Sequence, residues 1–340
     1  MIAHRRLVST AALAASVLLA AMPARAAEKL IVTTNVPPVH WASTQGGEPF
    51  MKCVKEATKG DIDFNYFPSG QIAGFTKSLD AVNDGLAQIS YIVVSAQTDK
   101  LPLNGIPILP ELGRNVVEMT RAYRKAIDAN GLLMQEYAKN RIRPLMINMF
   151  PPYQMMSRAD AMDTLDKIRG KKISSGGGSL IVTLKALGAN AIEMAPSDIY
   201  LALQQGTVDG TMLALASVKP YKLQEVLKSV TSDAHFGSAA GVWSIDTAVW
   251  SRLSAGNQKA FTDCGNKVES ELAVWVDKWT EELKAELTAA GVKVTSVPAA
   301  ARPAMAEKLK LARDDYISRI ASRGLPAQKA YEDYLKALGQ

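Results

Sequence analysis

Residues 166–213 constrain the fold of this chain more than any other stretch, because segments with strand and helix patterns alternate along it. The pattern predicts a strand, a helix, a strand, a helix and a strand, at residues 172–174, 180–187, 190–194, 196–205 and 208–213. Gly206 stands where a residue with positive φ commonly ends a helix. Strands that alternate with helices in this order are typical of a parallel α/β layer. We therefore predict that this stretch is the core of one α/β lobe.

The same stretch carries a long ordered motif that resembles a known family, the solute-binding proteins of TRAP (tripartite ATP-independent periplasmic) transporters. The residues that match the second lobe of that family are Asp166, Gly170, Lys172, Ile173, Ala186, Leu187, Gly188, Ala189, Met194, Tyr200, Leu201, Ala202, Leu203, Gln204, Gly206, Val208, Asp209 and Gly210. Residues 66–74 (YFPSGQIAG) resemble a turn in the first lobe of the same family. The resemblance implies a protein that captures a small organic solute in the periplasm and delivers it to a membrane permease.

The resemblance also implies the fold class, an α/β periplasmic binding protein of type II-like architecture with two lobes, a cleft between them and a long helix bracing both. The expected lobes are 27–149 with 240–280 for the first, and 150–239 with 281–340, C-terminal helices included, for the second. The strand at 143–149 is expected to be the first crossing between the lobes, and a second crossing is expected to follow the strand around Trp243. Apolar residues at three- and four-residue spacing over 258–289 predict the long helix.

The first 26 residues are predicted to be a signal peptide. Residues 4–6 (HRR) are basic, residues 7–22 are apolar, and residues 24–26 (ARA) fit a cleavage site with small residues. A membrane anchor is the alternative, but the apolar run is short and rich in alanine for a membrane span. We expect cleavage after Ala26 and a mature protein in the periplasm.

The charge of the mature chain gives little support to a polyanionic partner. Removal of residues 1–26 takes three arginines from the 39 basic residues, which leaves 36 basic and 33 acidic residues and a net charge of +3. The basic residues are scattered along the chain, so no nucleic-acid partner is predicted. We expect a monomer, and the resemblance implies a small-molecule ligand and the TRAP membrane permease subunits as partners.

The chain has two cysteines, Cys53 and Cys264, and both lie in the part expected outside the cytoplasm. Such a compartment permits disulfides. The two residues are far apart in the sequence, so they do not form a metal-binding pair. Two alternatives stay open: one long-range disulfide, or two buried thiols that act as small hydrophobic side chains.

The sequence predicts no catalytic chemistry, metal or cofactor. After residue 26 the histidines are His40 and His235, and neither lies near a Ser or Cys nucleophile motif. The carboxylates show no paired acid–base spacing, and no cluster of metal-ligating residues stands out. We therefore expect a binding protein rather than an enzyme.

Residues 174–179 (SSGGGS) form a glycine-rich turn before the helix predicted at 180. Free backbone N–H groups at a helix N-terminus attract anions, and glycines let a ligand approach closely. The turn lacks the Gly-Lys-Ser/Thr ending of a nucleotide phosphate loop. Two interpretations stay open: a structural turn with Ser179 as N-cap, or a site where backbone donors, Ser174 and Ser175 hold a carboxylate.

This chain departs from the family pattern at three positions that commonly hold the ligand. Ser174 stands where most of the family has an arginine that pairs with the ligand carboxylate. Met212 and Leu213 stand where Glu and Asn are usual, and residues 150–153 (FPPY) stand where a second arginine often follows the strand. Serine does not reproduce the bidentate geometry of arginine. We therefore expect a more apolar pocket than in most of the family.

The candidate ligand-binding residues follow from the predicted strand ends, because the carboxyl ends of parallel strands border the cleft in such sheets. In chain order they are Asn35, His40, Trp41, Tyr91, Phe150, Tyr153, Ser174, Ser175, Gly176, Met212, Leu213, Phe236 and Trp243. This set favours an aromatic or otherwise apolar organic acid over a simple dicarboxylate. The alternatives are an uncharged or cationic solute in an aromatic cage, and an enzyme that uses the same scaffold.

Overall fold

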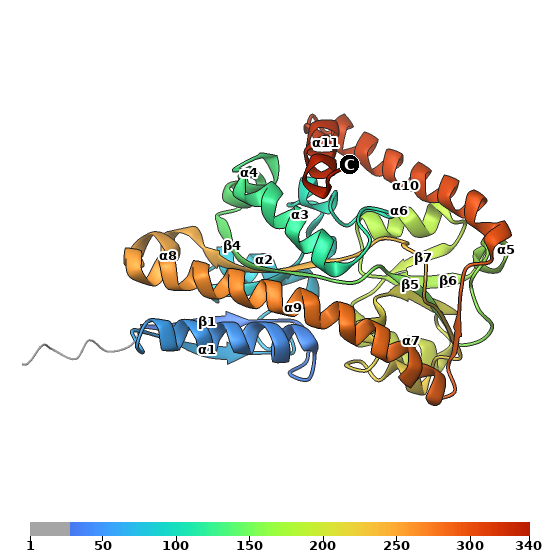
Figure 1. Ribbon diagram of the computed structural model, residues 1–340, viewed down its shortest axis with the longest axis horizontal. Coiled ribbons are helices and arrows are strands. Elements are labelled where there is room, and N and C mark those ends of the chain that lie inside the picture. Colours follow the sequence, from blue (N-terminus) through green and yellow to red (C-terminus); the bar gives the residue numbers. More distant parts are fainter. Residues whose placement is uncertain (1–27) are drawn as a thin grey trace, which may run out of the picture.

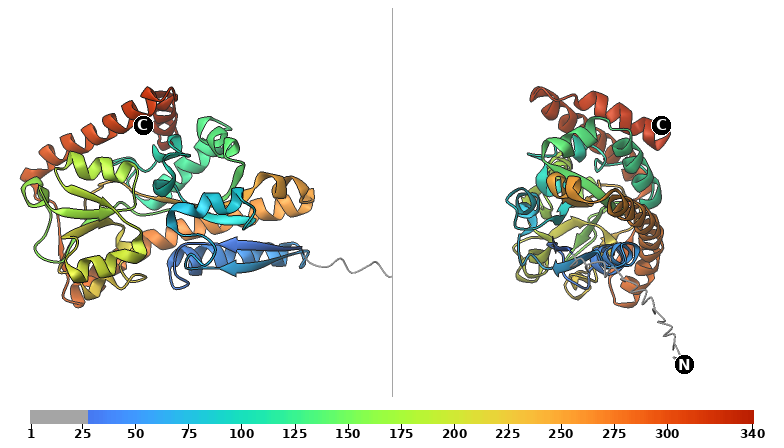
Figure 2. Two further views of the ribbon diagram at one scale, coloured as in Figure 1. Left: turned by 180° about the vertical axis from the view of Figure 1, so that it is seen from behind. Right: turned by 90° about the vertical axis from the view of Figure 1, so that its left-hand side faces the viewer.

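The computed structural model describes residues 28–340. The predicted signal peptide and its cleavage site after Ala26 lie outside the described residues. Two α/β lobes make up the described part of the chain, each built on one β-sheet with helices packed on it (Figures 1 and 2). No helix within 28–340 is long and apolar enough to cross a membrane.

The first lobe is built on a five-stranded sheet. Its strands, in sheet order, are β2 (Ile62–Phe67), β1 (Glu28–Thr33), β3 (Ile89–Val93), β10 (Ala240–Asp246) and β4 (Ile142–Met149). The helices of this lobe are the π-helix η1 (Ala42–Gly47), α1 (Glu48–Ala57), α2 (Ser78–Asn83), α3 (Val116–Asp128), α4 (Leu132–Lys139) and α8 (Thr247–Arg252). Only β10 runs antiparallel to its neighbours in this sheet.

The second lobe is built on a six-stranded sheet that contains the 166–213 stretch. Its strands, in sheet order, are β11 (Lys293–Thr295), β9 (Ser229–Thr231), β5 (Gln154–Ser157), β8 (Gly210–Leu213), β6 (Lys172–Ser175) and β7 (Asn190–Glu193). Its helices are α5 (Leu165–Ile168), α6 (Ser179–Ala186) and α7 (Ile199–Gln205). The alternation predicted for 166–213 is confirmed, and Gly206 ends α7 with φ 73°. Ser179, the N-cap in one of the two interpretations of the turn, is instead the first residue of α6, and Gly178 (φ 56°) takes the N-cap position.

The antiparallel strand of each sheet is the strand that arrives from the other lobe. The chain passes from β4 to β5 through 150–153, and from β9 to β10 through 232–239. The expected position of the second crossing is wrong, because it precedes the strand of Trp243, which pairs with β3 and β4 of the first lobe. Strands β10 and β5 start at the cleft, whereas their neighbours end there. Each of the two therefore runs antiparallel to its neighbours. The two crossings pair with each other, since the N–H groups of Phe150 and Tyr153 donate to carbonyls of the return crossing at 2.8 Å. Together they form a ribbon that joins the lobes.

Helix α9 (Ala255–Ala289) packs against both lobes (Figure 1). Ser254 caps its start by accepting a hydrogen bond from the N–H of Asn257. The helix contacts α1, α3 and β4 of the first lobe and β11 of the second. It is therefore the long bracing helix that the resemblance implies.

The C-terminal helices divide between the lobes. Helix α10 (Arg302–Ser322) packs on α6 of the second lobe, as expected. Helix α11 (Ala327–Leu338), which was expected in the second lobe, packs instead on α3 of the first lobe. Helix α11 reaches the first lobe because the long helix α10 carries the chain back over that lobe (Figure 1).

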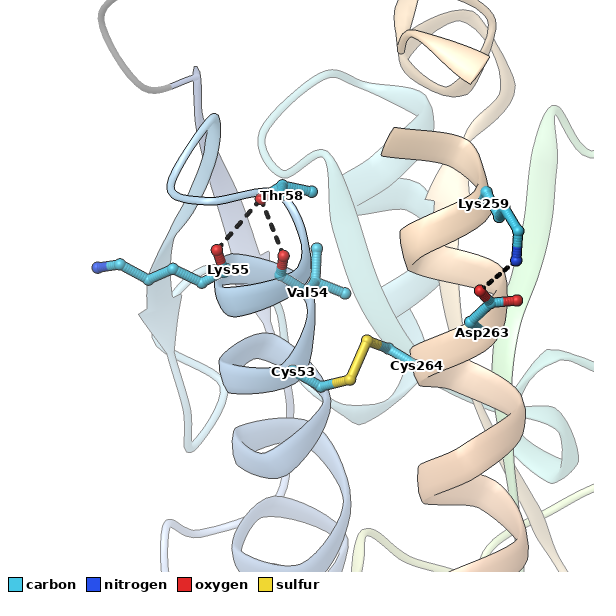
Figure 3. Close-up of a disulfide and its surroundings, with 7 residues drawn as sticks. All are labelled: Cys53, Val54, Lys55, Thr58, Lys259, Asp263 and Cys264. Carbon is cyan, nitrogen blue, oxygen red and sulfur yellow. Dashed lines mark hydrogen bonds and ion pairs between the residues drawn. A yellow bond between two sulfur atoms is a disulfide. The ribbon is translucent and has the colours of Figure 1, made fainter. Parts of the chain in front are cut away.

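Cys53 of α1 and Cys264 of α9 form a disulfide (Figure 3). Their Cα atoms lie 5.8 Å apart, within the range that a disulfide bridges. Cys264 is buried and Cys53 is half-buried. Of the two alternatives that the sequence leaves open, the structure has the disulfide, and the bond ties the first helix of the lobe to the bracing helix.

Candidate functional site

Aromatic side chains from both lobes meet where the strand ends face each other. The ring of His40 lies 5.0 Å from that of Trp41 and 5.6 Å from that of Tyr221, centroid to centroid. Trp41 packs edge-on against Phe150 at 4.8 Å, and Phe150 against Tyr153 at 6.4 Å. His40 and Trp41 precede α1 in the first lobe. Phe150 and Tyr153 lie on the first crossing, and Tyr221 belongs to the second lobe. This aromatic cluster therefore joins the two lobes at the crossing.

Tyr91 on β3 and Trp243 on β10 form a second aromatic contact, with ring centroids 5.0 Å apart. Burial raises the pKa of Tyr91, and the hydroxyls of Tyr221 and Tyr153 raise it further. This electrostatic effect places the Tyr91 hydroxyl near the aromatic cluster. The Tyr91 hydroxyl is buried and has no hydrogen-bond partner within residues 28–340.

His40 is completely buried, and its environment fixes both its charge and its tautomer. Burial lowers the pKa of His40 to about 3, so its ring is neutral at ordinary pH. The Nδ1 atom accepts a hydrogen bond from the N–H of Ala42 at 3.1 Å, which leaves the proton on Nε2. The Nε2 atom has no partner within the described chain. His40 therefore offers one free N–H donor to the region between the lobes.

This burial predicts an acid-sensitive fold. The unfolded chain binds a proton at His40 below its ordinary pKa of about 6.5, whereas the folded protein does not until about pH 3. The contribution of His40 to stability is therefore full above pH 6.5 and decreases as the pH falls. We expect His40 alone to lower the free energy of unfolding by about 2 kcal/mol between pH 7 and pH 5.

Urea denaturation of the ligand-free protein at the two pH values measures this loss. The matched variant is His40→Gln, whose amide can still accept the Ala42 N–H and does not titrate. Its stability should fall less between pH 7 and pH 5, by about 2 kcal/mol. Equal losses for the wild type and the variant would show that His40 is not the titrating group.

The glycine-rich turn of the second lobe touches the first lobe. A Cβ atom at Gly176 would lie 3.3 Å from the Phe75 ring, and one at Gly178 would lie 2.8 Å from the backbone oxygen of Ser95. Gly177 and Gly178 both have positive φ. The N–H groups of 176–179 have no hydrogen-bond acceptor within residues 28–340. The turn thus presents a row of free donors at the start of α6, in contact with the opposite lobe.

The two serines that precede this turn differ. The Ser174 hydroxyl is fully buried and has no partner in the described chain. The Ser175 hydroxyl donates to the carbonyl of Met212 at 2.9 Å, so its proton is not available to a ligand. Met212 and Leu213 are buried at the end of β8, where they pair with β5. Phe236 is buried on the return crossing, where its N–H bonds to the Tyr153 carbonyl at 3.3 Å.

Buried polar atoms without a partner gather among the predicted residues. Among the candidate residues, together with Asn148 and Ser179, the unpaired donors are Asn35 Nδ2, His40 Nε2, Trp41 Nε1, Tyr91 Oη, Asn148 Nδ2, Ser174 Oγ, Ser179 Oγ and Trp243 Nε1; Ser90, Thr120, Ser217 and Tyr334 are buried and unpaired as well. Buried polar groups in folded proteins are nearly always hydrogen-bonded, to protein, water or ligand. A set of this size beside one interlobe region is the pattern expected for a binding site whose ligand completes the hydrogen bonds.

A cavity of about 490 Å³ opens between the lobes, and Asn35 is the one of these unpaired donors that lines it. Its first-lobe wall is made by Asn35, Pro37, Ser69, Gly70, Gly74 and Phe75, and its second-lobe wall by Ala195, Pro196, Ser197, Pro220, Tyr221 and Lys222. Among these described residues Lys222 alone carries a positive charge, and it is exposed. Tyr221 connects the cavity to the aromatic cluster, because its ring also contacts His40.

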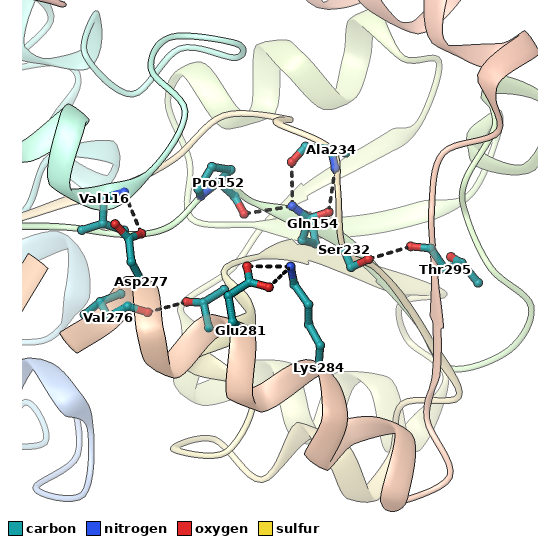
Figure 4. Close-up of polar contacts among 11 residues, drawn as sticks. Val116, Pro152, Gln154, Ser232, Ala234, Val276, Asp277, Glu281, Lys284 and Thr295 are labelled. Atoms are coloured by element: carbon teal, nitrogen blue, oxygen red, sulfur yellow. Dashed lines mark hydrogen bonds and ion pairs between the residues drawn. The ribbon is translucent and has the colours of Figure 1, made fainter. Parts of the chain in front are cut away.

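A larger hollow of about 610 Å³ lies beside the crossings, next to α9 (Figure 4). Its charged groups are already satisfied: Glu281 pairs with Lys284 at 2.7 Å, and Asp277 accepts the N–H groups of residues 116 and 117. Gln154 donates to the carbonyls of Pro152 and Ala234, so it holds the two crossings together. We assign this hollow to the hinge rather than to the ligand.

Two residues of the site, Tyr221 and Asn148, are absent from the candidates predicted by sequence. Tyr221 follows a 3₁₀ turn after β8, and Asn148 is the one amide in the apolar run of β4. An amide inside a buried strand is a signal in itself, because it needs a partner. Within the described residues no group of three or more His, Cys, Asp or Glu side chains could hold a metal ion.

Comparison with known proteins identifies the family. The model of the bacterial extracellular solute-binding proteins, family 7, matches residues 34–319. The chain belongs to this family. Family 7 proteins bind solutes and are not enzymes, which agrees with the expectation from the sequence.

The regions of this family 7 protein that match its relatives differ in length. The YiiZ protein of Salmonella typhimurium is 29% identical over 183 residues, which are 54% of this chain and 56% of that protein. A TRAP solute-binding protein from a marine metagenome, specific for aromatic acids and bound to 3-hydroxybenzoate, superposes with a TM-score of 0.85 at 17% identity, covering 92% of this chain and 98% of that one.

A TRAP solute-binding protein from Rhodoferax ferrireducens with copurified benzoate superposes with a TM-score of 0.84 at 18% identity, again over 92% and 98% of the two chains. At these identities the superpositions establish the shared fold. The expected two-lobe α/β architecture is thereby confirmed for this member of solute-binding family 7.

Proposed function

We propose that this protein captures an aromatic organic acid in the cleft between its lobes and delivers it to a TRAP permease. The observation that carries the proposal is the set of unpaired, uncharged donors among aromatic rings. His40 and Trp41 offer such donors from the first lobe, and Ser174 and the free N–H groups of 176–179 offer them from the second. The neighbouring proteins named above bind 3-hydroxybenzoate and benzoate, which supports this ligand class.

Charge and hydrogen-bond direction favour an anion over the alternatives. Indole and imidazole N–H groups and backbone N–H groups only donate, so they attract carboxylate oxygens and repel a cation. An aromatic cage for a cation needs ring faces without donors directed at the guest. An uncharged solute remains the second candidate, because no guanidinium takes the place of the family arginine at Ser174.

Binding experiments with small acids test this proposal. We expect benzoate and hydroxybenzoates to bind with micromolar dissociation constants, and succinate and malate to bind more weakly than about 100 µM, because a second carboxylate in the aromatic cluster would be desolvated without a cationic partner. Isothermal titration calorimetry of protein freed of copurified ligand gives the values. Benzamide and benzylamine are the uncharged and cationic comparisons.

Micromolar binding of succinate or malate would overturn the proposal. Tighter binding of benzamide than of benzoate would show that the ligand is an uncharged solute rather than an anion. The result expected is selective binding of the aromatic anions.

The cellular setting is part of the same proposal. The protein is exported with cleavage after Ala26 and acts in the periplasm as a monomer, without a nucleic-acid partner. The basic, apolar and small-residue segments of residues 1–26 support export. Mass spectrometry of the periplasmic fraction tests the cleavage site, since the mature chain should begin at Ala27.

A further inference from the structure

Tyr91, Asn148 and Trp243 are buried together in the first lobe with their polar atoms unpaired. Each side chain is at most 1% exposed. The unpaired atoms within the described chain are the Tyr91 hydroxyl, both amide atoms of Asn148 and the indole nitrogen of Trp243. The set therefore contains an amide oxygen that only accepts, as well as donors, whereas His40, Trp41 and the backbone N–H groups of the turn only donate.

The strand register places the three side chains on one face of the sheet. Trp243 pairs with Tyr91, and Gly241 pairs with Asn148. Side chains that pair across strands, or that are two residues apart on one strand, point to the same face. Burial raises the pKa of Tyr91, neighbouring tyrosines raise it further, and an interaction with the Asn148 side chain opposes the rise. The amide and the hydroxyl are therefore neighbours, although their distance and angle do not make a hydrogen bond within the described chain.

Glycines make the room that these side chains occupy. A Cβ atom at Gly241 would lie 1.9 Å from the Tyr91 hydroxyl oxygen, and one at Gly47 would lie 2.3 Å from the Trp243 ring. A Cβ atom at Gly46 would lie 2.9 Å from the Asn148 amide nitrogen. Gly46 and Gly47 belong to the π-helix η1, a rare conformation that is frequent at functional sites. The backbone thus approaches these polar groups closely from two sides.

The chemistry of the unpaired atoms limits what can satisfy them. A carboxylate only accepts hydrogen bonds, so it would leave the Asn148 oxygen unpaired. A hydroxyl donates to that oxygen and accepts from the Asn148 amide or the Trp243 N–H. A site built to bind a hydroxyl discriminates against an analogue without it, because the polar groups of the site are then left buried and unpaired.

We propose that Tyr91, Asn148 and Trp243 form a subsite for a hydroxyl group, so that the ligand is a hydroxylated aromatic acid. This inference rests on the proposed function, because it assumes that an aromatic acid occupies the cleft. All three residues belong to the sheet of the first lobe, so the subsite is complete within one lobe. The carboxylate then faces the donors of His40, Trp41 and the glycine-rich turn.

Calorimetry with benzoate and the 2-, 3- and 4-hydroxybenzoates tests the subsite. We expect the best hydroxybenzoate to bind the wild type about 10-fold more tightly than benzoate. In Asn148→Leu this ratio should fall to about one, while benzoate binds as before or more tightly, because the apolar side chain leaves no unpaired amide. Tyr91→Phe removes one hydroxyl from the same subsite and should lower the ratio about threefold.

The matched control is Ser90→Ala. Ser90 is also buried and unpaired on β3, but it is adjacent to Tyr91 and so points to the opposite face. This variant should keep the wild-type ratio, and thermal melting shows whether each variant folds. A wild-type ratio near one, or an unchanged ratio in both Asn148→Leu and Tyr91→Phe, would overturn the subsite and leave buried water as the partner. Failure of every aromatic acid to bind would instead overturn the proposed function.

Discussion

Glu269→Gln is expected to lower the free energy of unfolding by about 3 kcal/mol, although it changes only one atom of the side chain. Glu269 of α9 is 5% exposed and accepts hydrogen bonds from Arg124 of α3 at 3.0 Å and from the N–H of Ile147 at 2.7 Å. The glutamine keeps the shape but leaves the buried Arg124 guanidinium with only the exposed carboxylate of Asp128, 3.7 Å away, as a counter-charge. Urea denaturation at neutral pH measures the loss.

A second substitution separates charge from shape. Arg124→Met on the Glu269→Gln background removes the buried charge that Asp128 compensates only in part, and the glutamine still accepts the Ile147 N–H. We therefore expect the double variant to be more stable than Glu269→Gln alone. The exposed pair Lys259–Asp263 on the same helix is the control, since Asp263→Asn should change stability by less than about 0.5 kcal/mol. Equal losses for Glu269→Gln and Asp263→Asn would contradict the prediction.

This ion pair matters for function because α9 holds the lobes. Three elements that carry or support the site, α3, α9 and β4, meet at Glu269. Asn148 follows Ile147 by one residue on β4. A loosened pair should therefore weaken ligand binding as well as the fold, through the position of the strand and without any contact to the ligand.

The sequence predicts the second lobe well and the crossings poorly, for a physical reason. Strands β6, β7 and β8 alternate with helices, so local pattern alone defines them. Strands β5 and β9 have four and three residues, and they exist because each crossing brings them against a neighbouring strand. Pairing between distant segments leaves little periodicity in so short a strand. Helix α4 was missed as well, because Asn130 and Gly131 end one helix immediately before the next begins.

Some residues of the candidate site can likewise be predicted from the sequence, and others cannot. His40, Trp41, Phe150 and Tyr153 follow strand ends, and the topology of a parallel sheet is enough to nominate them. Asn148 and Tyr221 could be assigned to the site only from the structure. The same holds for the difference between Ser174 and Ser175. The hydroxyl of Ser174 is free and that of Ser175 is bonded to a carbonyl. This difference depends on the register of β6 against β8, which the sequence alone does not give. Whether each candidate touches the ligand stays a prediction.

Loss of the disulfide is the second large effect that we expect. The bond between Cys53 and Cys264 closes a loop of 211 residues. A cross-link of that span restricts the unfolded chain and contributes about 3–5 kcal/mol by chain entropy. The double variant Cys53→Ala, Cys264→Ala should therefore unfold at clearly lower urea concentration than the wild type. Because Cys53 is half-buried, loss of its packing adds little to this change.

Reduction provides the control for that experiment. Dithiothreitol should lower the stability of the wild type toward that of the double variant and should leave the double variant unchanged. A loss below about 1 kcal/mol would show that the reduced chain keeps the two helices together in its unfolded state. The bond joins α1, which continues directly from η1 beside His40 and Trp41, to the helix that braces both lobes. Ligand affinity should therefore fall in the double variant, even though neither cysteine contributes to the aromatic cluster.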